Sequence, residues 1–329
     1  MNLPDPITYP KPPGQERPCP KPTKTGRALF KIPNHDLQGE TAYEIYGNLE
    51  CSKVPLIALH GGPGIPHGYL LPLSLVLIDY GVPVVMYDQI GCGDSTHFPD
   101  RIGDRTLWTP ELFMAELDNL KQALGITKFD LFGTSWGGIL AAHYTTTMQP
   151  AGLRKLIISS SPASMKTWMK VSKELRTAMP IDHQDTLSRC EKEGKMETPE
   201  YEAATHEFNK RYLCRLDPLP KELDEPLKAW IEDPTVEMTM FGLSDVDITG
   251  SLRTWNMEED LKKLTAEAVP GGILLMNGYF DLAQDECMLP FFKEPSARVK
   301  WVRFGLSSHV PQLEETEKYV KALGSFLQD

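Results

Sequence analysis

The stretch Gly133-Thr134-Ser135-Trp136-Gly137 places a serine between two glycines, where a strand predicted over residues 128–132 is followed by a helix predicted over residues 138–148. A sharp strand-to-helix turn of this kind holds the serine hydroxyl above the sheet, where it can attack a carbonyl carbon. The glycines leave room where side chains would collide with the neighbouring backbone. The five-residue pattern is common, but its position between a strand and a helix makes Ser135 a candidate nucleophile.

A serine nucleophile needs a base, and the base needs a carboxylate that orients it. With a serine turn of this type, the acid and then the histidine follow the serine along the chain. Asp281 comes a few residues after a strand predicted over residues 272–276, and His309, the last histidine, follows a strand predicted over residues 299–304. Asp285 is a nearby rival that lies further from the strand end. We therefore favour Asp281 as the acid and His309 as the base.

The oxyanion that forms during attack needs two backbone donors. His60-Gly61-Gly62-Pro63-Gly64 follows a buried strand predicted over residues 54–59, and a glycine-rich loop in this place supplies one N–H in enzymes with such a serine turn. The residue after the nucleophile supplies the other. We predict an oxyanion hole formed by the amides of Trp136 and of Gly62 or Gly61.

A second glycine-rich loop, Asp88-Gln89-Ile90-Gly91-Cys92-Gly93-Asp94-Ser95, follows a buried strand predicted over residues 82–87. It lacks the Lys-Ser/Thr ending of a phosphate-binding loop, so we expect a structured turn beside the active site. His60 is expected to brace its own loop, because a residue at a strand end is poorly placed to reach the serine hydroxyl.

The elements that must position these residues alternate between strands and helices. Residues 26–32 and 40–46 flank a turn-rich segment and predict an opening antiparallel hairpin. Residues 109–124 carry apolar side chains at helical spacing after Thr109, a candidate N-cap. Such alternation predicts an α/β protein with a mostly parallel sheet covered on both faces.

Two segments depart from this alternation. Residues 1–25 are rich in proline, which resists helix formation, and predict an arm that lies on the surface or is partly disordered. Residues 162–268 lack buried strand runs, are rich in charge and are helical in period, so they predict a helical cap inserted over one edge of the sheet. Residues 26–161 and 269–329 then form the α/β core.

The bulk composition narrows the function classes. The 329-residue chain has a formal net charge of −11, which repels phosphate backbones and anionic lipid, so we expect neither a nucleic-acid partner nor a membrane. Its six cysteines form no CxxC pair and no metal-ligand spacing is evident, which indicates free thiols and no metal. The N-terminus has no signal-peptide pattern. These features predict a cytoplasmic protein without a cofactor.

Together, the motifs resemble the proline iminopeptidases (prolyl aminopeptidases), a family of serine peptidases with the α/β-hydrolase fold. The resemblance runs from about residue 26 to the C-terminus. It implies a helical cap, a cytosolic location, no cofactor, and release of an N-terminal residue, often proline, from small peptides or amides. It is carried by the serine turn, by the two glycine-rich loops, and by Gly278-Tyr279-Phe280-Asp281 and Ser308-His309-Val310-Pro311-Gln312-Leu313-Glu314.

The family holds the α-ammonium group of its substrate with glutamates of the cap. Gly242-Leu243-Ser244-Asp245-Val246 resembles the family's Gly-Pro-Ser-Glu-Phe, with Asp245 in place of the glutamate. The resemblance places a second carboxylate near Glu202 or Glu207, and both stay open. An aspartate is one methylene shorter than a glutamate, so its reach to an amine differs and strict proline specificity does not follow.

The leading hypothesis is an aminopeptidase that acts through an acyl-enzyme on a small peptide or amide with a free amine. One alternative is an esterase, amidase or tailoring hydrolase that uses the same triad on a specialised metabolite. Another is a binding protein on a hydrolase scaffold, which usually has a broken triad. The sequence does not fix the oligomeric state.

Overall fold

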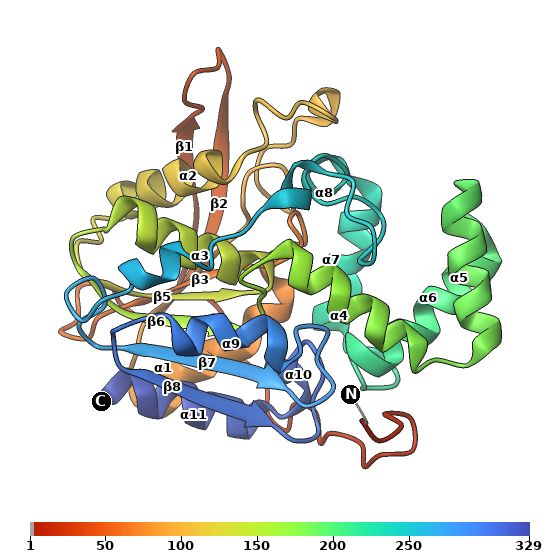
Figure 1. Cartoon of the computed structure of the whole chain (residues 1–329). Coiled ribbons are helices and arrows are strands. Elements are labelled where there is room, and N and C mark those ends of the chain that lie inside the picture. Colours follow the sequence, from red (N-terminus) through yellow and green to blue (C-terminus); the bar gives the residue numbers. More distant parts are fainter. Residues whose placement is uncertain (1–2) are drawn as a thin grey trace.

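The computed structural model describes residues 3–329, so residues 1–2 of the predicted arm lie outside the described part. A single eight-stranded sheet runs through the centre of the molecule (Figure 1) in the order β1-β2-β4-β3-β5-β6-β7-β8. Its strands are β1 (Lys24–Lys31), β2 (Gln38–Tyr46), β3 (Leu56–Leu59), β4 (Val84–Tyr87), β5 (Phe129–Thr134), β6 (Leu153–Ser159), β7 (Ile273–Gly278) and β8 (Val299–Phe304).

The sheet is antiparallel at one edge and parallel elsewhere. β1 and β2 form the predicted hairpin, and β2 pairs antiparallel with β4. From β4 through β3, β5, β6 and β7 to β8, every neighbouring pair is parallel. The predicted hairpin and mostly parallel sheet are therefore confirmed. The parallel strands carry their C-terminal ends, and the loops that follow, to one edge of the sheet.

Helices cover both faces of the sheet because side chains alternate along each strand. Ile57 of β3 and Leu131 of β5 pack into a core with α2, α3 and α9, whereas their neighbours Ala58 and Phe132 face the opposite core with α1 and α11. The covering helices are α1 (Leu75–Tyr80), α2 (Pro110–Ala123), α3 (Trp136–Met148), α9 (Asp285–Lys293), α10 (Pro311–Glu314) and α11 (Thr316–Gln328). Thr109 caps α2, as predicted, by accepting from the Leu112 amide.

Between β6 and β7 the chain forms helices and no strand within the described residues. These helices stand together at one end of the sheet (Figure 1), where the strand-end loops lie. They are α4 (Met165–Thr177), α5 (Ile181–Glu193), α6 (Pro199–Tyr212), α7 (Lys221–Glu232) and α8 (Thr235–Met240), followed by the short 3-10 helices Ser251–Thr254 and Asp260–Lys263. Two further 3-10 helices, His67–Ser74 and Pro99–Arg101, lie in the core. The division into a core and a cap at residues 162 and 268 stays a prediction.

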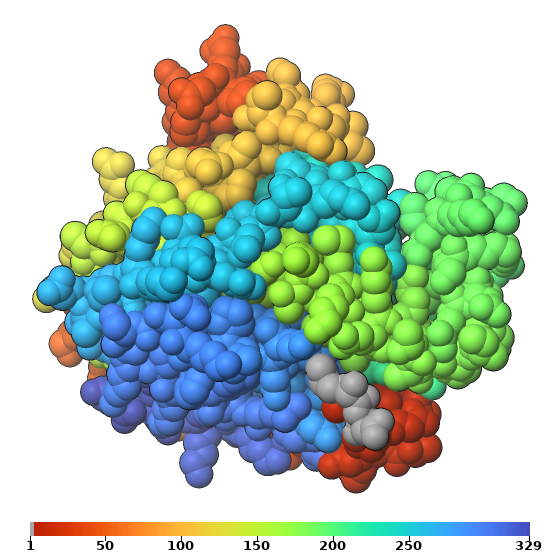
Figure 2. All heavy atoms as spheres, viewed as in Figure 1, coloured from red at the N-terminus to blue at the C-terminus, as the bar shows by residue number. Residues whose placement is uncertain are grey.

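The N-terminal arm, residues 3–23, contains no helix or strand. It lies on the surface against the C-terminal part of the core and below the helices of residues 165–240 (Figure 2, red). Pro6, Pro12 and Gly14 are nevertheless buried, and the Gly14 amide donates to the Glu314 carbonyl at 2.8 Å. The arm is thus held against the molecule by specific contacts.

Candidate active site

Ser135 occupies the single-residue turn between β5 and α3, and its backbone is strained, with φ of 54° and ψ of −124°. Positive φ is unfavourable for a residue with a side chain and, where it occurs, is held by the surroundings. Two glycines allow the turn to close. A Cβ at Gly133 would lie 2.0 Å from the Gly137 carbonyl oxygen, and a Cβ at Gly137 would lie 2.2 Å from the Leu59 carbonyl oxygen. The structure therefore has the sharp strand-to-helix turn that the sequence predicts.

His309 is hydrogen-bonded to Asp281, with 2.7 Å between Nδ1 and Oδ1. The carboxylate is fully enclosed and also accepts from the amides of Ala283, at 2.7 Å, and Gly278, at 3.2 Å. The rival Asp285 accepts instead from Asn277 and forms an ion pair with Arg303. The structure thus brings together the histidine and the aspartate that the sequence favours.

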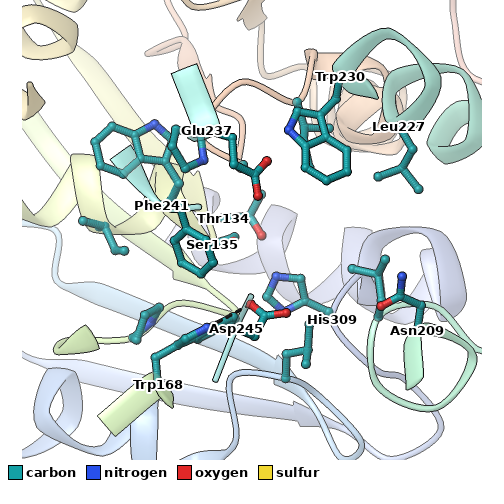
Figure 3. A pocket seen from close by; sticks show the side chains of 18 of the residues that line it. Thr134, Ser135, Trp168, Asn209, Leu227, Trp230, Glu237, Phe241, Asp245 and His309 are labelled. Carbon is teal, nitrogen blue, oxygen red and sulfur yellow. Dashed lines mark hydrogen bonds between the residues drawn. The ribbon is translucent and has the colours of Figure 1, made fainter. Parts of the chain in front are cut away.

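Ser135 and His309 line one cavity of about 230 Å³ (Figure 3). Its wall is mostly apolar and is built from the strand-end loops of the core and from the helices of residues 165–240. Trp168 of α4 packs its ring edge-to-face against the His309 imidazole, with 5.9 Å between centroids. A reacting carbonyl in this cavity would be enclosed by low-dielectric walls, which strengthen electrostatic interactions.

The backbone amides of Trp136, Gly62 and Gly61 are the candidates for the two donors of the oxyanion hole. Trp136 and Gly62 line the cavity, and Trp136 is the first residue of α3, where an amide has no acceptor within its own helix. The Gly61 amide donates to the Tyr69 hydroxyl and is already engaged. The geometry therefore favours Gly62 over Gly61 as the partner of Trp136.

Gln89 connects the two sides of this candidate oxyanion hole, and sequence reasoning did not single it out. Its side chain accepts from Trp136 Nε1 at 2.8 Å and donates to the His60 carbonyl at 3.1 Å. Its backbone amide donates to His60 Nε2 at 2.9 Å. Burial lowers the pKa of His60 to about 4, so its imidazole is neutral and can accept this bond. His60 thus braces its loop, as expected.

Two carboxylates line the cavity, Asp245 and Glu237 (Figure 3). Asp245 accepts from Trp168 Nε1 at 3.1 Å, whereas Glu237 Oε2 has no hydrogen-bond partner among the described residues. Loss of hydration raises the pKa of Asp245, and it raises the pKa of Glu237 further with help from the nearby Asp245 charge. A cation bound beside either group would lower its pKa and so oppose these shifts.

The structure does not bring Glu202 or Glu207 into the cavity. Both lie on α6, whose cavity-facing residues are Thr205 and Asn209, one helical turn apart. Glu202 is exposed to solvent, and Glu207 forms an ion pair with Arg211. The helical period turns these glutamates away from the cavity, and the carboxylate that lines it together with Asp245 is Glu237. A sequence signal existed, because Glu237 is the only charged residue in the run from Thr235 to Leu243.

His60, Asp88 and Cys92 lie close enough to hold a metal ion between them. Their ligand atoms are already engaged, since His60 Nε2 accepts from the Gln89 amide and Asp88 accepts from His67 and from the Asp94 amide. Burial raises the pKa of the Cys92 thiol well above its usual value, so the thiolate that a metal requires is disfavoured. The arrangement braces the loops beside the active site.

Comparison with known proteins identifies first the class and then the family. The family model for the alpha/beta hydrolase fold matches residues 54–316, and this class agrees with the parallel sheet and the serine turn. The proline iminopeptidase of Heyndrickxia coagulans is 34% identical over 273 residues, 83% of this chain and 90% of that protein. A second, from Clostridium botulinum, is 32% identical over 294 residues, 88% of this chain and 95% of that one.

Two solved structures are similar over more than nine tenths of this chain. The crystal structure of VinJ is similar with a TM-score of 0.86 and 36% identity, covering 93% of this chain and 99% of that one. A proline iminopeptidase of Mycobacterium smegmatis is similar with a TM-score of 0.80 and 34% identity, covering 92% and 98%. The chain belongs to the proline iminopeptidase family of α/β-hydrolase enzymes. Within residues 3–329, no helix is long and apolar enough to cross a membrane.

Proposed function

We propose that this protein is a serine aminopeptidase that removes an N-terminal proline, or a similar residue, from small peptides or amino-acid amides. The observation that carries the proposal is the presence of Asp245 and Glu237 in the same cavity as Ser135 and His309. An esterase has no need of two carboxylates beside its nucleophile. A substrate with a protonated amine does, because the two negative charges would neutralise and orient it.

In the proposed reaction, the Ser135 hydroxyl attacks the carbonyl carbon of the N-terminal residue while His309 takes its proton. Asp281 holds the imidazole in the required tautomer and stabilises its charged form. The amides of Trp136 and Gly62 hold the oxyanion of the tetrahedral intermediate. The protonated His309 then gives its proton to the leaving amine, and an acyl-enzyme remains on Ser135.

Water completes the cycle. His309 takes a proton from a water molecule, which attacks the acyl carbon and releases the amino acid as Ser135 recovers its proton. Throughout, the substrate ammonium stays between Asp245 and Glu237. Because this cation lowers the energy of the two ionised carboxylates, its binding compensates for their loss of hydration.

The free-amine requirement is tested by comparing the anilide of proline with its N-acetylated form. We expect kcat/KM for the acetylated compound to be lower by on the order of 100-fold, because charge-assisted hydrogen bonds to two carboxylates are lost. Equal rates on the two compounds would contradict the proposal and favour the esterase or amidase alternative. N-methylproline anilide, whose tertiary amine is still protonated and keeps one N–H donor, is the control and should remain a better substrate than the acetylated compound.

Cellular location and partners remain proposals from the sequence. A cytoplasmic location is supported by the six cysteines, all of which carry free thiols. The negative net charge argues against a nucleic-acid partner. Fractionation of cells that produce the protein, followed by immunodetection, would test the location; recovery in a secreted fraction would contradict it.

A further inference from the structure

The proline-rich arm closes around the guanidinium group of Arg215, which follows α6 in the chain. Arg215 donates to three carbonyl oxygens of the arm, those of Pro6 at 2.6 Å, Tyr9 at 3.1 Å and Pro10 at 3.2 Å. The guanidinium also lies 5.9 Å from the centre of the Tyr9 ring. Arg215 is only 6% exposed, so the arm supplies a large part of the hydrogen bonding that a buried guanidinium requires.

The other side of Arg215 contacts the loops that carry the catalytic acid and base. Its guanidinium lies 4.4 Å from the ring centre of Phe280, the residue before Asp281, and donates to the carbonyl of Leu306, three residues before His309. Its backbone amide donates to Glu314 at 2.7 Å.

Glu314 and Leu213 extend this contact to the histidine itself. Glu314 accepts from the Ser308 amide at 2.7 Å, and the His309 amide donates to the carbonyl of Leu213, two residues before Arg215. The Tyr9 ring of the arm packs edge-to-face on Phe280, with 5.0 Å between centroids. Arm, arginine and catalytic loops therefore form one continuous set of contacts.

The composition of the arm favours these contacts with Arg215. Proline keeps its carbonyl acceptor but has no N–H, and its ring fixes φ, so a proline-rich segment presents acceptors at a low cost in conformational entropy. Without the arm, three acceptors of a buried cation would be missing. An unpaired buried guanidinium is costly, so Arg215 would be driven to turn toward water and to leave Phe280 and the Leu306 carbonyl.

We propose that residues 3–14 act, through Arg215, as a strap that positions the loops of Asp281 and His309 for catalysis. Arg215 and Tyr9 are positioning residues, since neither lines the cavity. The inference rests on the catalytic roles proposed above for Asp281 and His309. It assigns a function to the arm, which the chemistry of the site alone leaves unexplained.

A chain that begins at Gln15 tests the strap. We expect its kcat on proline anilide to fall by about 10- to 100-fold, with KM changed less than about twofold, because small misplacements of catalytic groups reduce the rate of chemistry. The rate of Ser135 labelling by a fluorophosphonate should fall in parallel. A synthetic peptide of residues 1–14, added in excess, should restore both rates.

Arg17→Ala is the matched control. Arg17 anchors the far end of the arm through ion pairs with Asp79 and Glu317, away from the cavity. This variant should keep the kcat of the full chain. Unchanged kcat and labelling in the folded truncated chain, or an equal fall in Arg17→Ala, would overturn the strap.

Substitutions in the full chain keep the inference testable if the truncated chain does not fold. Tyr9→Ala should lower kcat several-fold, whereas Tyr9→Phe, which keeps the ring on Phe280, should retain it. Equal kcat in Tyr9→Ala and the full chain, or equal losses in both Tyr9 variants, would overturn the inference. Fluorophosphonate labelling needs no knowledge of the substrate. If the full chain labels but does not hydrolyse proline anilide, the proposed function fails, and the labelling rates still test the strap.

Discussion

Asp281 of the core and the two cavity acids of the helical segment between β6 and β7 are in different electrostatic situations. Asp281, in the core, accepts three hydrogen bonds, one from His309 and two from backbone amides. Glu237 and Asp245, in the helical segment, share the cavity, and Glu237 Oε2 lacks a protein partner among the described residues. The protein satisfies Asp281 before substrate arrives, whereas in the cavity Asp245 accepts from Trp168 and Glu237 Oε2 is left for a ligand.

Under the proposed function, this difference separates chemistry from recognition. A catalytic carboxylate must hold one geometry in every turnover, so fixed donors from the protein suit it. A recognition carboxylate gains more by staying unsatisfied, because the free energy released when a cation arrives then goes to substrate binding. Variants of the core should therefore slow every substrate, and variants of the helical segment should slow only substrates that carry an amine.

The largest effect is expected for Ser135→Ala. Removing the proposed nucleophile should lower kcat on the order of 10⁶-fold, on amine-bearing anilides and on simple esters alike, and should abolish labelling by a fluorophosphonate. Ser172→Ala, in α4, is the matched control and should keep full activity, since Ser172 does not line the cavity. Residual labelling of Ser135→Ala at the original rate would show that another residue is the nucleophile.

Asp281→Asn comes next, with an expected loss in kcat of about 10⁴-fold, because the amide favours the wrong tautomer of His309. Asp285→Asn should change kcat less than about twofold, because Asp285 pairs with Arg303 and is partly exposed. Steady-state kinetics of both variants on one anilide would measure the contrast. A larger loss in Asp285→Asn than in Asp281→Asn would reverse the assignment of the acid.

Glu237→Gln and Asp245→Asn should each lower kcat/KM for proline anilide by on the order of 10- to 100-fold. Hydrolysis of phenyl acetate, which has no amine, should remain within about twofold of the original rate. Glu202→Gln and Glu207→Gln are matched controls from the same helical segment and should leave both activities unchanged, because neither side chain lines the cavity. Equal losses on both substrates in Glu237→Gln would mean that this acid serves chemistry.

The smallest expected effect is on how the free energy of unfolding changes with pH. Desolvation raises the pKa values of Glu237 and Asp245 above their usual values. At a pH between the unfolded and the folded pKa of each group, the folded state therefore binds a proton that the unfolded state has released. The free energy of unfolding contributed by these groups is therefore present at low pH and lost as pH rises above about 4.5, near the unfolded value.

Chemical denaturation of the ligand-free protein at pH 5 and pH 8 would measure this change. The decrease in the free energy of unfolding should be smaller in the double variant Glu237→Gln/Asp245→Asn than in the original chain. Other raised groups, such as Glu314 with a pKa of about 7, contribute equally to both proteins and cancel in the comparison. An identical decrease in the two proteins would show that the pKa values of Glu237 and Asp245 are not raised in the folded state.

Much of the core could be predicted because its signals are local. The strand 299–304 has the predicted bounds, and α2 begins after the predicted cap Thr109. The helix after Ser135 starts two residues earlier than periodicity indicates, because Trp136 and Gly137 already belong to its first turn.

The sequence by itself determined the serine turn and the pairing of Asp281 with His309, because glycine spacing, strand ends and chain order can be read from the sequence. The tertiary structure alone decided which acids enter the cavity. Glu237 points inward and Glu202 and Glu207 do not, since the orientation of a helix about its axis depends on what it packs against. It also decided that a proline-rich arm would meet Arg215, a contact across about 200 residues of chain that only the folded backbone creates.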